Sequence, residues 1–269
     1  MDSVVTTKFI GELLGSFSLI ALGCGISMNL TLDKSYGEGN KATLSGPLGW
    51  GFAVAMSVII SSPFDTGGHF NPAVTLAQWA AGVFDSQLVL PYIAAQFIGC
   101  FLGALVVSFV YGGHLSATSA DSGKILGVFA TNASIRKNNS VQNFSAEVIG
   151  TFFLVFIGLS MGANHGGVII ENTTGIPQFT HSMVGFGSLG ALPAGFMIFA
   201  IGMAYGGVTG WSLNPARDLM PRLVHQILPL KGKGDSDWGY GIVYASLAPI
   251  VGGMLAAGLY LLVKEYFLK

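Results

Sequence analysis

Six long apolar segments limit what this chain can fold into more than any other feature of its sequence. They cover residues 9–30, 47–61, 88–111, 145–161, 189–205 and 238–263. A helix needs about 20 apolar residues to cross the hydrocarbon core of a bilayer, and each segment is that long or nearly so. Only 9% of the 269 residues are charged, against about 25% in soluble domains. The sequence therefore predicts an all-α membrane protein with six transmembrane helices in one domain, residues 1–269.

The rest of the composition argues against several classes of function. The net charge of −1 gives no reason to expect nucleic acid as a partner. Cys24 and Cys100 lie in apolar runs and the histidines are scattered, so no metal site is expected. No nucleotide-binding loop or catalytic triad is visible, and we expect neither a cofactor nor an enzyme activity. The first apolar segment is too long for the core of a signal peptide and is expected to remain as a helix.

Two shorter segments, residues 71–81 and 214–225, both begin with Asn-Pro-Ala. Proline suits the first position of a helix and asparagine is a good N-cap, so each segment is expected to be a half-helix that starts abruptly. Glycine-rich stretches precede them, at residues 66–70 and 206–210. Irregular backbone enters a bilayer only where it lines a wet cavity or is buried in protein. Both half-helices are therefore expected to be re-entrant.

The chain also repeats itself. Residues 12–19 (ELLGSFSL) match residues 147–154 (EVIGTFFL), and Asn-Pro-Ala follows later in each half. We expect a first repeat at about 6–112, a second at about 144–266 and a connecting loop at 113–143. Three crossings per repeat invert the second repeat relative to the first. The half-helices would then enter from opposite sides and point their N-termini at each other near the membrane midplane.

Both Asn-Pro-Ala motifs lie in matching places, and an arginine follows the second. The residues are Asn71, Pro72, Ala73, Asn214, Pro215, Ala216 and Arg217. Together with the repeated glutamate they resemble the aquaporin, or major intrinsic protein, family over nearly the whole chain. One such tripeptide would be weak evidence for the family, but two in matching places of a repeat are specific to it. The resemblance implies the aquaporin-like bundle, a pore in every subunit and a homotetramer in lipid.

Helix physics gives the paired motifs a role in the pore. Two facing helix N-termini place partial positive charge at its centre, and the side-chain amides of Asn71 and Asn214 are expected to donate hydrogen bonds to a passing oxygen. That orientation would interrupt proton transfer along a file of water, and the helix field would repel cations. The alternative is that both asparagines act only as N-caps.

The resemblance also implies a selectivity filter made of Trp50, Gly202, Trp211 and Arg217. An arginine at membrane depth costs at least about 2.5 kcal/mol, so it usually faces water or a partner. Two aromatic rings opposite its donors would suit a small polyol. The alternatives are a structural Arg217 that holds loop carbonyls and a Trp50 in the interfacial aromatic belt. Trp211 is larger than the phenylalanine of the best-known glycerol facilitators and could narrow the filter.

The remaining site residues are expected to line the pore or to support it. The predicted lining before the two motifs is Gly67, Gly68, His69, Phe70, Gly210, Ser212 and Leu213. Glu12 and Glu147 are expected to accept hydrogen bonds from this irregular backbone, with a proton relay as the alternative. Asp218, an acidic residue typical of aquaglyceroporins, extends the resemblance to that glycerol-facilitator branch of the family. It is expected to hold the loop and half-helix. For His69, a simple packed histidine is the alternative.

Some features depart from the family pattern. Ala245 and Ser246 stand where glycerol facilitators often have proline and an aliphatic residue, and the approach at 62–65 is about one residue longer. The long connection at 162–188 is hypothesised to cover the inner mouth, unless it is an insertion without a role.

The family topology and the distribution of charge disagree on orientation. The resemblance places both termini in the cytoplasm of a cell-membrane protein. Counting Lys and Arg favours the opposite orientation. The supposed inner side holds Lys8, Lys264 and Lys269, and the supposed outer loops hold Lys34, Lys41, Lys124, Arg136, Lys137, Lys231 and Lys233. We follow the resemblance.

The sequence thus predicts a passive channel for glycerol, water and other small uncharged solutes that excludes protons and ions. A water-selective channel is the first alternative. A secondary transporter also uses broken helices in inverted repeats, and a junction protein with a nearly closed pore is the third. Urea, dihydroxyacetone, hydrogen peroxide and undissociated lactic acid remain open as solutes.

Overall fold

The structure, a computed structural model, describes residues 3–39, 44–118, 122–135, 138–163, 168–170, 182–184 and 187–267. Within these ranges it has six helices that are long and apolar enough to cross a membrane. The prediction of six transmembrane helices is confirmed. Most of them extend beyond the apolar segments, because polar residues at the helix ends continue the same helical turns.

Four helices form the first half of the chain: α1 (Ser3–Thr31), α2 (Ser45–Ser61), α3 (Pro72–Ala80) and α4 (Ser86–Val110), with the 3₁₀ turn η1 (Ser62–Phe64) after α2. Helix α1 packs against α4, and two glycines of α4 face it. A Cβ on Gly99 would lie 2.4 Å from the carbonyl oxygen of Leu13, and one on Gly103 would lie 2.5 Å from that of Phe17. Small residues allow such close backbone approach between membrane helices.

The second half has the same order of helices: α7 (Ser140–Ala163), the 3₁₀ turn η3 (Gly187–Ala191), α8 (Leu192–Thr209), α9 (Pro215–Ile227), α10 (Trp238–Ile242), η4 (Val243–Leu247) and α11 (Ala248–Phe267). Helix α10, the π-helical turn η4 and α11 form one continuous final helix. Helix α7 packs against α11 as α1 packs against α4. A Cβ on Gly252 would lie 2.2 Å from the carbonyl oxygen of Val148.

Helices α2 and α8 join the two halves. A Cβ on Gly51 would lie 2.6 Å from the carbonyl oxygen of Gly195, and one on Gly195 would lie 2.7 Å from that of Gly51. The two backbones therefore cross at this pair of glycines with no room for a side chain.

Two connections that we expected to be loops contain regular structure. The segment between the halves holds α5 (Gly112–Ala117) and α6 (Ser122–Phe129). Helix α6 packs on α1 and α9 and buries Ile125, Leu126 and Phe129. Such a short helix is stabilised by tertiary burial rather than by propensity, so the surrounding polar sequence did not indicate it.

The other connection, between α7 and α8, contains two short antiparallel strands. They are β1 (Val168–Ile170) and β2 (Ser182–Val184), and Val168 lies opposite Val184. The hypothesis that this connection covers the inner mouth falls mostly on residues 164–167, 171–181 and 185–186, which lie outside the described residues.

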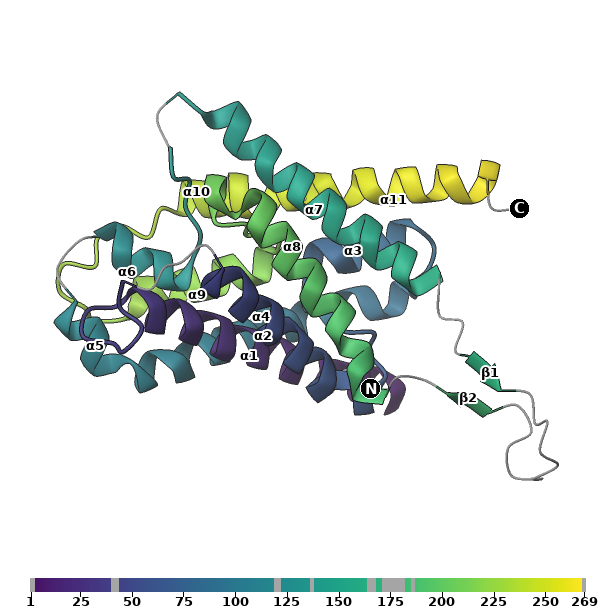
Figure 1. The fold of residues 1–269 in the computed structure, drawn as a ribbon, viewed down its shortest axis with the longest axis horizontal. Helices are drawn as coiled ribbons and strands as arrows, with labels where there is room; N and C mark the ends of the chain where they lie inside the picture. Colours follow the sequence, from purple (N-terminus) through teal and green to yellow (C-terminus); the bar gives the residue numbers. More distant parts are fainter. Residues whose placement is uncertain are drawn as a thin grey trace.

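Figure 1 shows most of the spanning helices running roughly along the long axis of the molecule. The start of α1 and the end of α11 lie toward the side of β1 and β2, and α5, α6 and α10 lie at the opposite end. An even number of crossings requires both ends of the chain to lie on the same side of the membrane. Each of the six helices also exposes large apolar side chains, including Leu22, Phe52, Phe109, Phe153, Phe196 and Leu262. Exposed apolar surface on this scale favours contact with lipid or with other subunits.

Candidate functional site

The half-helices α3 and α9 begin where the sequence predicts them, directly after Asn71 and Asn214. The Asn71 Oδ1 atom accepts a hydrogen bond from the backbone N–H of Ala73 at 2.8 Å. The Asn214 Oδ1 atom accepts from the N–H groups of Ala216 at 3.0 Å and Arg217 at 3.2 Å. Capping thus uses the amide oxygen and leaves the amide N–H groups for other partners.

Reciprocal hydrogen bonds join the N-termini of the two half-helices. The Nδ2 atom of Asn71 donates to the carbonyl oxygen of Leu213 at 2.7 Å, and that of Asn214 donates to the carbonyl oxygen of Phe70 at 2.8 Å. Phe70 and Leu213 have φ values of 47° and 54°, a left-handed conformation that costs about 1–3 kcal/mol for a residue with a side chain. Each amide has two N–H groups, so each asparagine has a second N–H beyond the one used in this pairing.

Glu12 and Glu147 hold this strained backbone in the same way. The two carboxyl oxygens of Glu12 accept from the backbone N–H groups of the two residues before Asn71, at 2.9 and 2.8 Å. Those of Glu147 accept from the two residues before Asn214, both at 2.9 Å. Both glutamates are fully buried. Buried backbone N–H groups need partners, and each carboxyl group satisfies two in succession.

A glycine in each repeat makes room for the residue before the cap, a role that we did not predict. Gly15 lies one turn after Glu12, and a Cβ there would lie 2.0 Å from Cε1 of Phe70. At the matching Gly150, a Cβ would lie 2.7 Å from Cδ2 of Leu213. The signal was present, because both glycines fall inside the matched segments of the repeat.

The fourth residue of the half-helix differs between the halves. In α3 it is Thr75, whose hydroxyl oxygen lies 3.1 Å from Nδ1 of His69 and accepts from Nε2 of Gln96 at 2.9 Å. The same Gln96 nitrogen donates to Glu12 at 2.8 Å. A chain of neutral hydrogen-bonding groups therefore links the buried Glu12 to His69.

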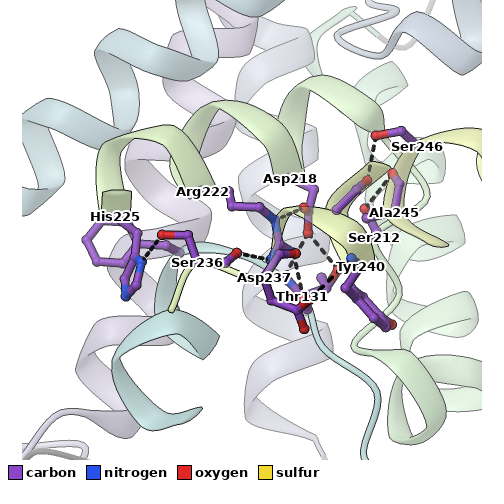
Figure 2. A network of polar contacts seen from close by, with 12 residues as sticks. Thr131, Ser212, Asp218, Arg222, His225, Ser236, Asp237, Tyr240, Ala245 and Ser246 are labelled. Atoms are coloured by element: carbon purple, nitrogen blue, oxygen red, sulfur yellow. Dashed lines mark hydrogen bonds and ion pairs between the residues drawn. The ribbon is translucent and has the colours of Figure 1, made fainter. Parts of the chain in front are cut away.

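In α9 the fourth residue is Asp218, which belongs to the polar network in Figure 2. Its Oδ2 atom accepts from the N–H and the hydroxyl of Thr131 at 2.8 and 2.7 Å, and its Oδ1 atom accepts from Nε of Arg222 at 2.7 Å. Arg222 is fully buried and donates to the carbonyl oxygens of Thr131, Ser236 and Asp237 at 2.8, 2.6 and 3.1 Å. The network joins α9 to the segments before α7 and before α10.

His225, near the end of α9, extends this network. Its Nδ1 atom lies 2.8 Å from the hydroxyl oxygen of Ser236. Burial lowers the pKa of His225 to about 4, and the positive charge of Lys233 acts in the same direction. The ring is therefore neutral at pH 7. Lys233 donates to the carbonyl oxygens of His225, Gln226 and Leu228, at 2.7, 2.7 and 2.5 Å, and so satisfies the end of the helix.

A cavity of about 570 Å³ runs past the point where α3 and α9 meet, and both halves of the chain line it. Most of the predicted site residues lie in its wall: Trp50, Gly67, Gly68, His69, Phe70, Asn71, Trp211, Ser212, Leu213, Asn214 and Arg217. Seven others are buried without lining it: Pro72, Ala73, Pro215, Ala216, Glu12, Glu147 and Asp218.

Gly202 and Gly210, by contrast, were predicted at the pore and do not line the cavity. A Cβ on Gly202 would lie 3.0 Å from Cβ of Pro47 and 3.1 Å from Cε2 of Trp211, and one on Gly206 would lie 2.2 Å from Cε3 of Trp211. Gly202 and Gly206 thus form a slot for the Trp211 ring, which covers Gly202. Gly210 instead ends α8 with a φ of 77°, a conformation that suits glycine.

Trp50, Trp211 and Arg217 form an arginine–tryptophan cluster in the cavity wall. The guanidinium carbon of Arg217 lies 4.2 Å from the centre of a Trp50 ring, a cation–π contact. Arg217 is only 8% exposed, and its Nη1 atom is buried with no hydrogen-bond partner among the described residues. The Trp50 Nε1 atom donates to the hydroxyl oxygen of Ser27 at 3.1 Å. The ring of Trp50 therefore faces the arginine while its N–H is already used.

Several supporting residues were not predicted: Ser27, Thr75, Gln96, Gly206 and Arg222. Their partners are distant in sequence or visible only in three dimensions. A polar or charged residue inside an apolar or re-entrant segment was the available signal for Gln96 and Arg222.

Six spanning helices, two half-helices joined at their N-termini and a cavity lined by both halves define a channel-type membrane protein. A family model described as Major intrinsic protein matches residues 2–260. The chain belongs to the major intrinsic protein family.

Its relatives include proteins named for glycerol. Glycerol uptake facilitator protein 3 of Lactiplantibacillus plantarum is 43% identical over 260 residues, which are 97% of this chain and 98% of the relative. The probable glycerol uptake facilitator protein of Thermotoga maritima is 40% identical over 252 residues, 94% of this chain and 97% of the relative. The X-ray structure of the aquaglyceroporin from Plasmodium falciparum matches with a TM-score of 0.72 and 27% identity, covering 98% of this chain and 97% of that one. The predicted resemblance to the aquaglyceroporin branch is confirmed.

Proposed function

We propose that this protein is a passive channel that carries glycerol, water and other small uncharged solutes across the membrane and excludes protons and ions. The observation that carries the proposal is the reciprocal pairing of Asn71 and Asn214 in the wall of one cavity. The names of the relatives, which are glycerol uptake facilitators, support glycerol as a solute.

The paired asparagines give a physical basis for excluding protons. A solute oxygen between them accepts the remaining N–H of each amide, so its own O–H groups point away along the pore. A file of water oriented outward from this point cannot pass a proton by successive donation. The partial positive charges at the N-termini of α3 and α9 also disfavour any cation there.

The arginine–tryptophan cluster supports the filter role. The rings of Trp50 and Trp211 offer apolar surface to the carbon atoms of a solute, while Arg217 offers donors to its oxygens. Gly202 acts in this filter only indirectly, because it lets the Trp211 ring lie back against α8. The glutamates act structurally, because both oxygens of each carboxyl group are used by backbone N–H groups.

For the assembly we propose a homotetramer in the cell membrane, with a pore in each subunit and cytoplasmic termini. The exposed apolar side chains of the six spanning helices support contact with lipid and with other subunits. The resemblance to the family supports the tetramer and the orientation.

Stopped-flow measurements on proteoliposomes test the proposal. Glycerol and water permeability should exceed those of empty liposomes, without saturation or dependence on a sodium or proton gradient. Water flux without glycerol flux would instead indicate a water-selective channel. Saturable, gradient-dependent uptake would indicate a transporter, and negligible flux of every solute would indicate a structural role.

Two neighbouring glycines provide a matched control for the route of the solute. In Gly206→Ala the new methyl group would lie 2.2 Å from the Trp211 ring and push it into the cavity. At Gly207 the added Cβ would meet nothing within 4 Å among the described residues outside its own turn of helix. Gly206→Ala should lower glycerol flux by about tenfold, equivalent to roughly 1.4 kcal/mol in the barrier. Gly207→Ala should retain it. Equal fluxes in the two variants would argue against a route past Trp211.

A further inference from the structure

The two repeats place matching residues at the two ends of the cavity. Their register is fixed by the capping asparagines and by the crossing of α2 and α8, where Gly51 and Gly195 contact each other. The residues that match the arginine–tryptophan cluster in this register are Ala194 for Trp50, Gly68 for Trp211 and Val74 for Arg217. All six line the cavity. The end opposite the cluster therefore has the same frame, with a small or aliphatic residue at each position.

A glycine on the neighbouring helix shows how much space this exchange leaves. Gly23 of α1 matches Gly158 of α7, because both helices continue the repeated segments in the same register. A Cβ on Gly23 would lie 2.4 Å from Cζ3 of Trp50. A Cβ on Gly158 or on Gly190, which both line the cavity, would meet nothing within 4 Å among the described residues outside its own turn. Ala194 thus leaves open the place that the Trp50 ring fills in the other half.

The open chamber, as we name it, is the end of the cavity lined by Gly68, Val74, Gly158, Gly190 and Ala194. Figure 1 shows the end of α7 and the start of α8, which border it, on the side of β1 and β2. The other described residues of its wall include the apolar Val83, Leu159 and Met161 and the polar His69, Gln78 and Tyr260. Of the described residues that line the whole cavity, only Arg217 is charged, and it belongs to the other end.

This wall suits a small neutral aromatic molecule. Ligand pockets are mostly apolar, hold a few polar groups that fix orientation and measure about 300–1,000 Å³, and the whole cavity measures about 570 Å³. An aromatic ring gains from leaving water for apolar surroundings, and a methionine such as Met161 makes favourable contacts with ring edges. The amide of Gln78 offers both donors and an acceptor to one polar group of the ligand. An ionised ligand would find no partner of opposite charge among these side chains.

We propose that the open chamber binds small neutral molecules that combine one aromatic ring with one hydrogen-bonding group, and that the bound molecule blocks the channel. Indole is the reference ligand, because the indole ring of Trp50 fills the matching place beside Gly23 in the other half. A ring held between α3, α7 and α8 occupies the cavity itself and leaves no free path along it. The block rests on the proposed function, because it needs a solute route, whereas the binding can be measured without flux.

The test measures glycerol flux in proteoliposomes at rising indole concentrations, corrected for empty liposomes at the same concentration. Flux through the wild type should fall along a saturation curve. Ala194→Trp places a covalent indole ring where the added one binds and should raise the half-inhibitory concentration about tenfold or more. Phe196→Trp is the matched control, because it adds the same ring to the same helix at an exposed position that does not line the cavity. It should leave the half-inhibitory concentration unchanged.

Gly158→Leu is the second variant, in case Ala194→Trp does not fold or conduct. Its side chain enters the open chamber from α7 and should also raise the half-inhibitory concentration. Saturation-transfer NMR of indole with the protein in micelles measures binding without flux, and the signal should be weaker in both filled variants than in the wild type and Phe196→Trp.

An uninhibited wild type, or equal inhibition of the wild type and the filled variants, would overturn the inference and leave the proposed function intact. Absence of glycerol flux through the wild type without indole would overturn the proposed function. The NMR comparison would then still decide on the binding site, and equal signals from all the proteins would overturn it.

Discussion

The half-helices α3 and α9 start with the same motif, yet the rest of the molecule holds them in different ways. Both have an asparagine cap, a glutamate that bridges two backbone N–H groups and a glycine that clears space. They differ at the fourth residue. Thr75 of α3 accepts a hydrogen bond from Gln96 of α4, which also donates to Glu12 of α1, so these contacts stay in its own half of the chain. Asp218 of α9 pairs with Arg222 and reaches Thr131 in the segment between the halves.

This difference separates the residues that form the pore centre from the residues that attach each half-helix to its surroundings. The shared residues act where the two N-termini meet, so both halves must have them. The residues that differ act away from that point and fix each half-helix to its own surroundings. A buried ion pair is intolerant of losing one partner, so we expect the attachment of α9 to be more sensitive than that of α3.

The largest effect should come from breaking the ion pair on the α9 side. Arg222→Met leaves the fully buried Asp218 without its cationic partner and should lower the free energy of unfolding by about 3–5 kcal/mol. Thr75→Val, at the position of α3 that matches Asp218, should cost only about 1 kcal/mol. Denaturant unfolding in detergent micelles measures both. Equal losses would show that the two attachments are equivalent.

A smaller difference is expected at the paired glycines. In Gly15→Ala the methyl group would lie 2.0 Å from the rigid ring of Phe70, whereas in Gly150→Ala it would lie 2.7 Å from the end of the flexible Leu213. Overpacking of the first kind costs about 1–3 kcal/mol. The second should be close to neutral, because alanine gains about 1 kcal/mol of helix propensity over glycine. Thermal unfolding of the two variants checks this, and a Gly150 variant that is the less stable of the two would contradict it.

The paired glutamates should respond almost alike. In Glu12→Gln or Glu147→Gln, an amide N–H₂ group faces a backbone N–H that the carboxyl oxygen used to satisfy, which should cost about 2 kcal/mol. Glu12→Gln should be slightly worse, because Gln96 donates to the same group. Glycerol flux and thermal stability, measured together, report both effects. If one of the variants were silent, the two glutamates would not share a role.

The smallest effect concerns acid pH and only the α9 side. Because burial lowers the pKa of His225 to about 4, the unfolded chain, with an ordinary pKa near 6.5, takes up the proton first as pH falls. The contribution of the neutral His225 ring to the free energy of unfolding is complete above pH 6.5 and is lost as pH falls toward 4. Between pH 7 and 5.5 we expect a loss of at most about 1 kcal/mol, with screening at the site reducing it. His225→Gln should flatten the dependence of the free energy of unfolding on pH in this range. An unchanged dependence in the variant would assign the effect to another titrating group.

Much of this arrangement could be predicted from the sequence, because its signals are local. Apolar length indicated the spans, Asn-Pro-Ala indicated the abrupt helix starts, and the repeated segment indicated the inversion. The parts that we missed depend on contacts between distant segments. Arg222 meets Thr131, and the Trp211 ring covers Gly202, so a residue predicted at the pore surface lies behind an aromatic ring. Helix α6 was missed for the same reason, since its stability comes from burial against α1 and α9.

The most direct test of the central claim measures proton and glycerol permeation in the same vesicles. Proteoliposomes with a pH-sensitive dye inside are given a glycerol gradient and, separately, a proton gradient. If the paired N-termini of α3 and α9 orient each passing oxygen, glycerol entry should be fast. The internal pH should change no faster than it does in empty liposomes. A proton flux that rises with the amount of protein, or glycerol entry no faster than through bare lipid, would contradict it.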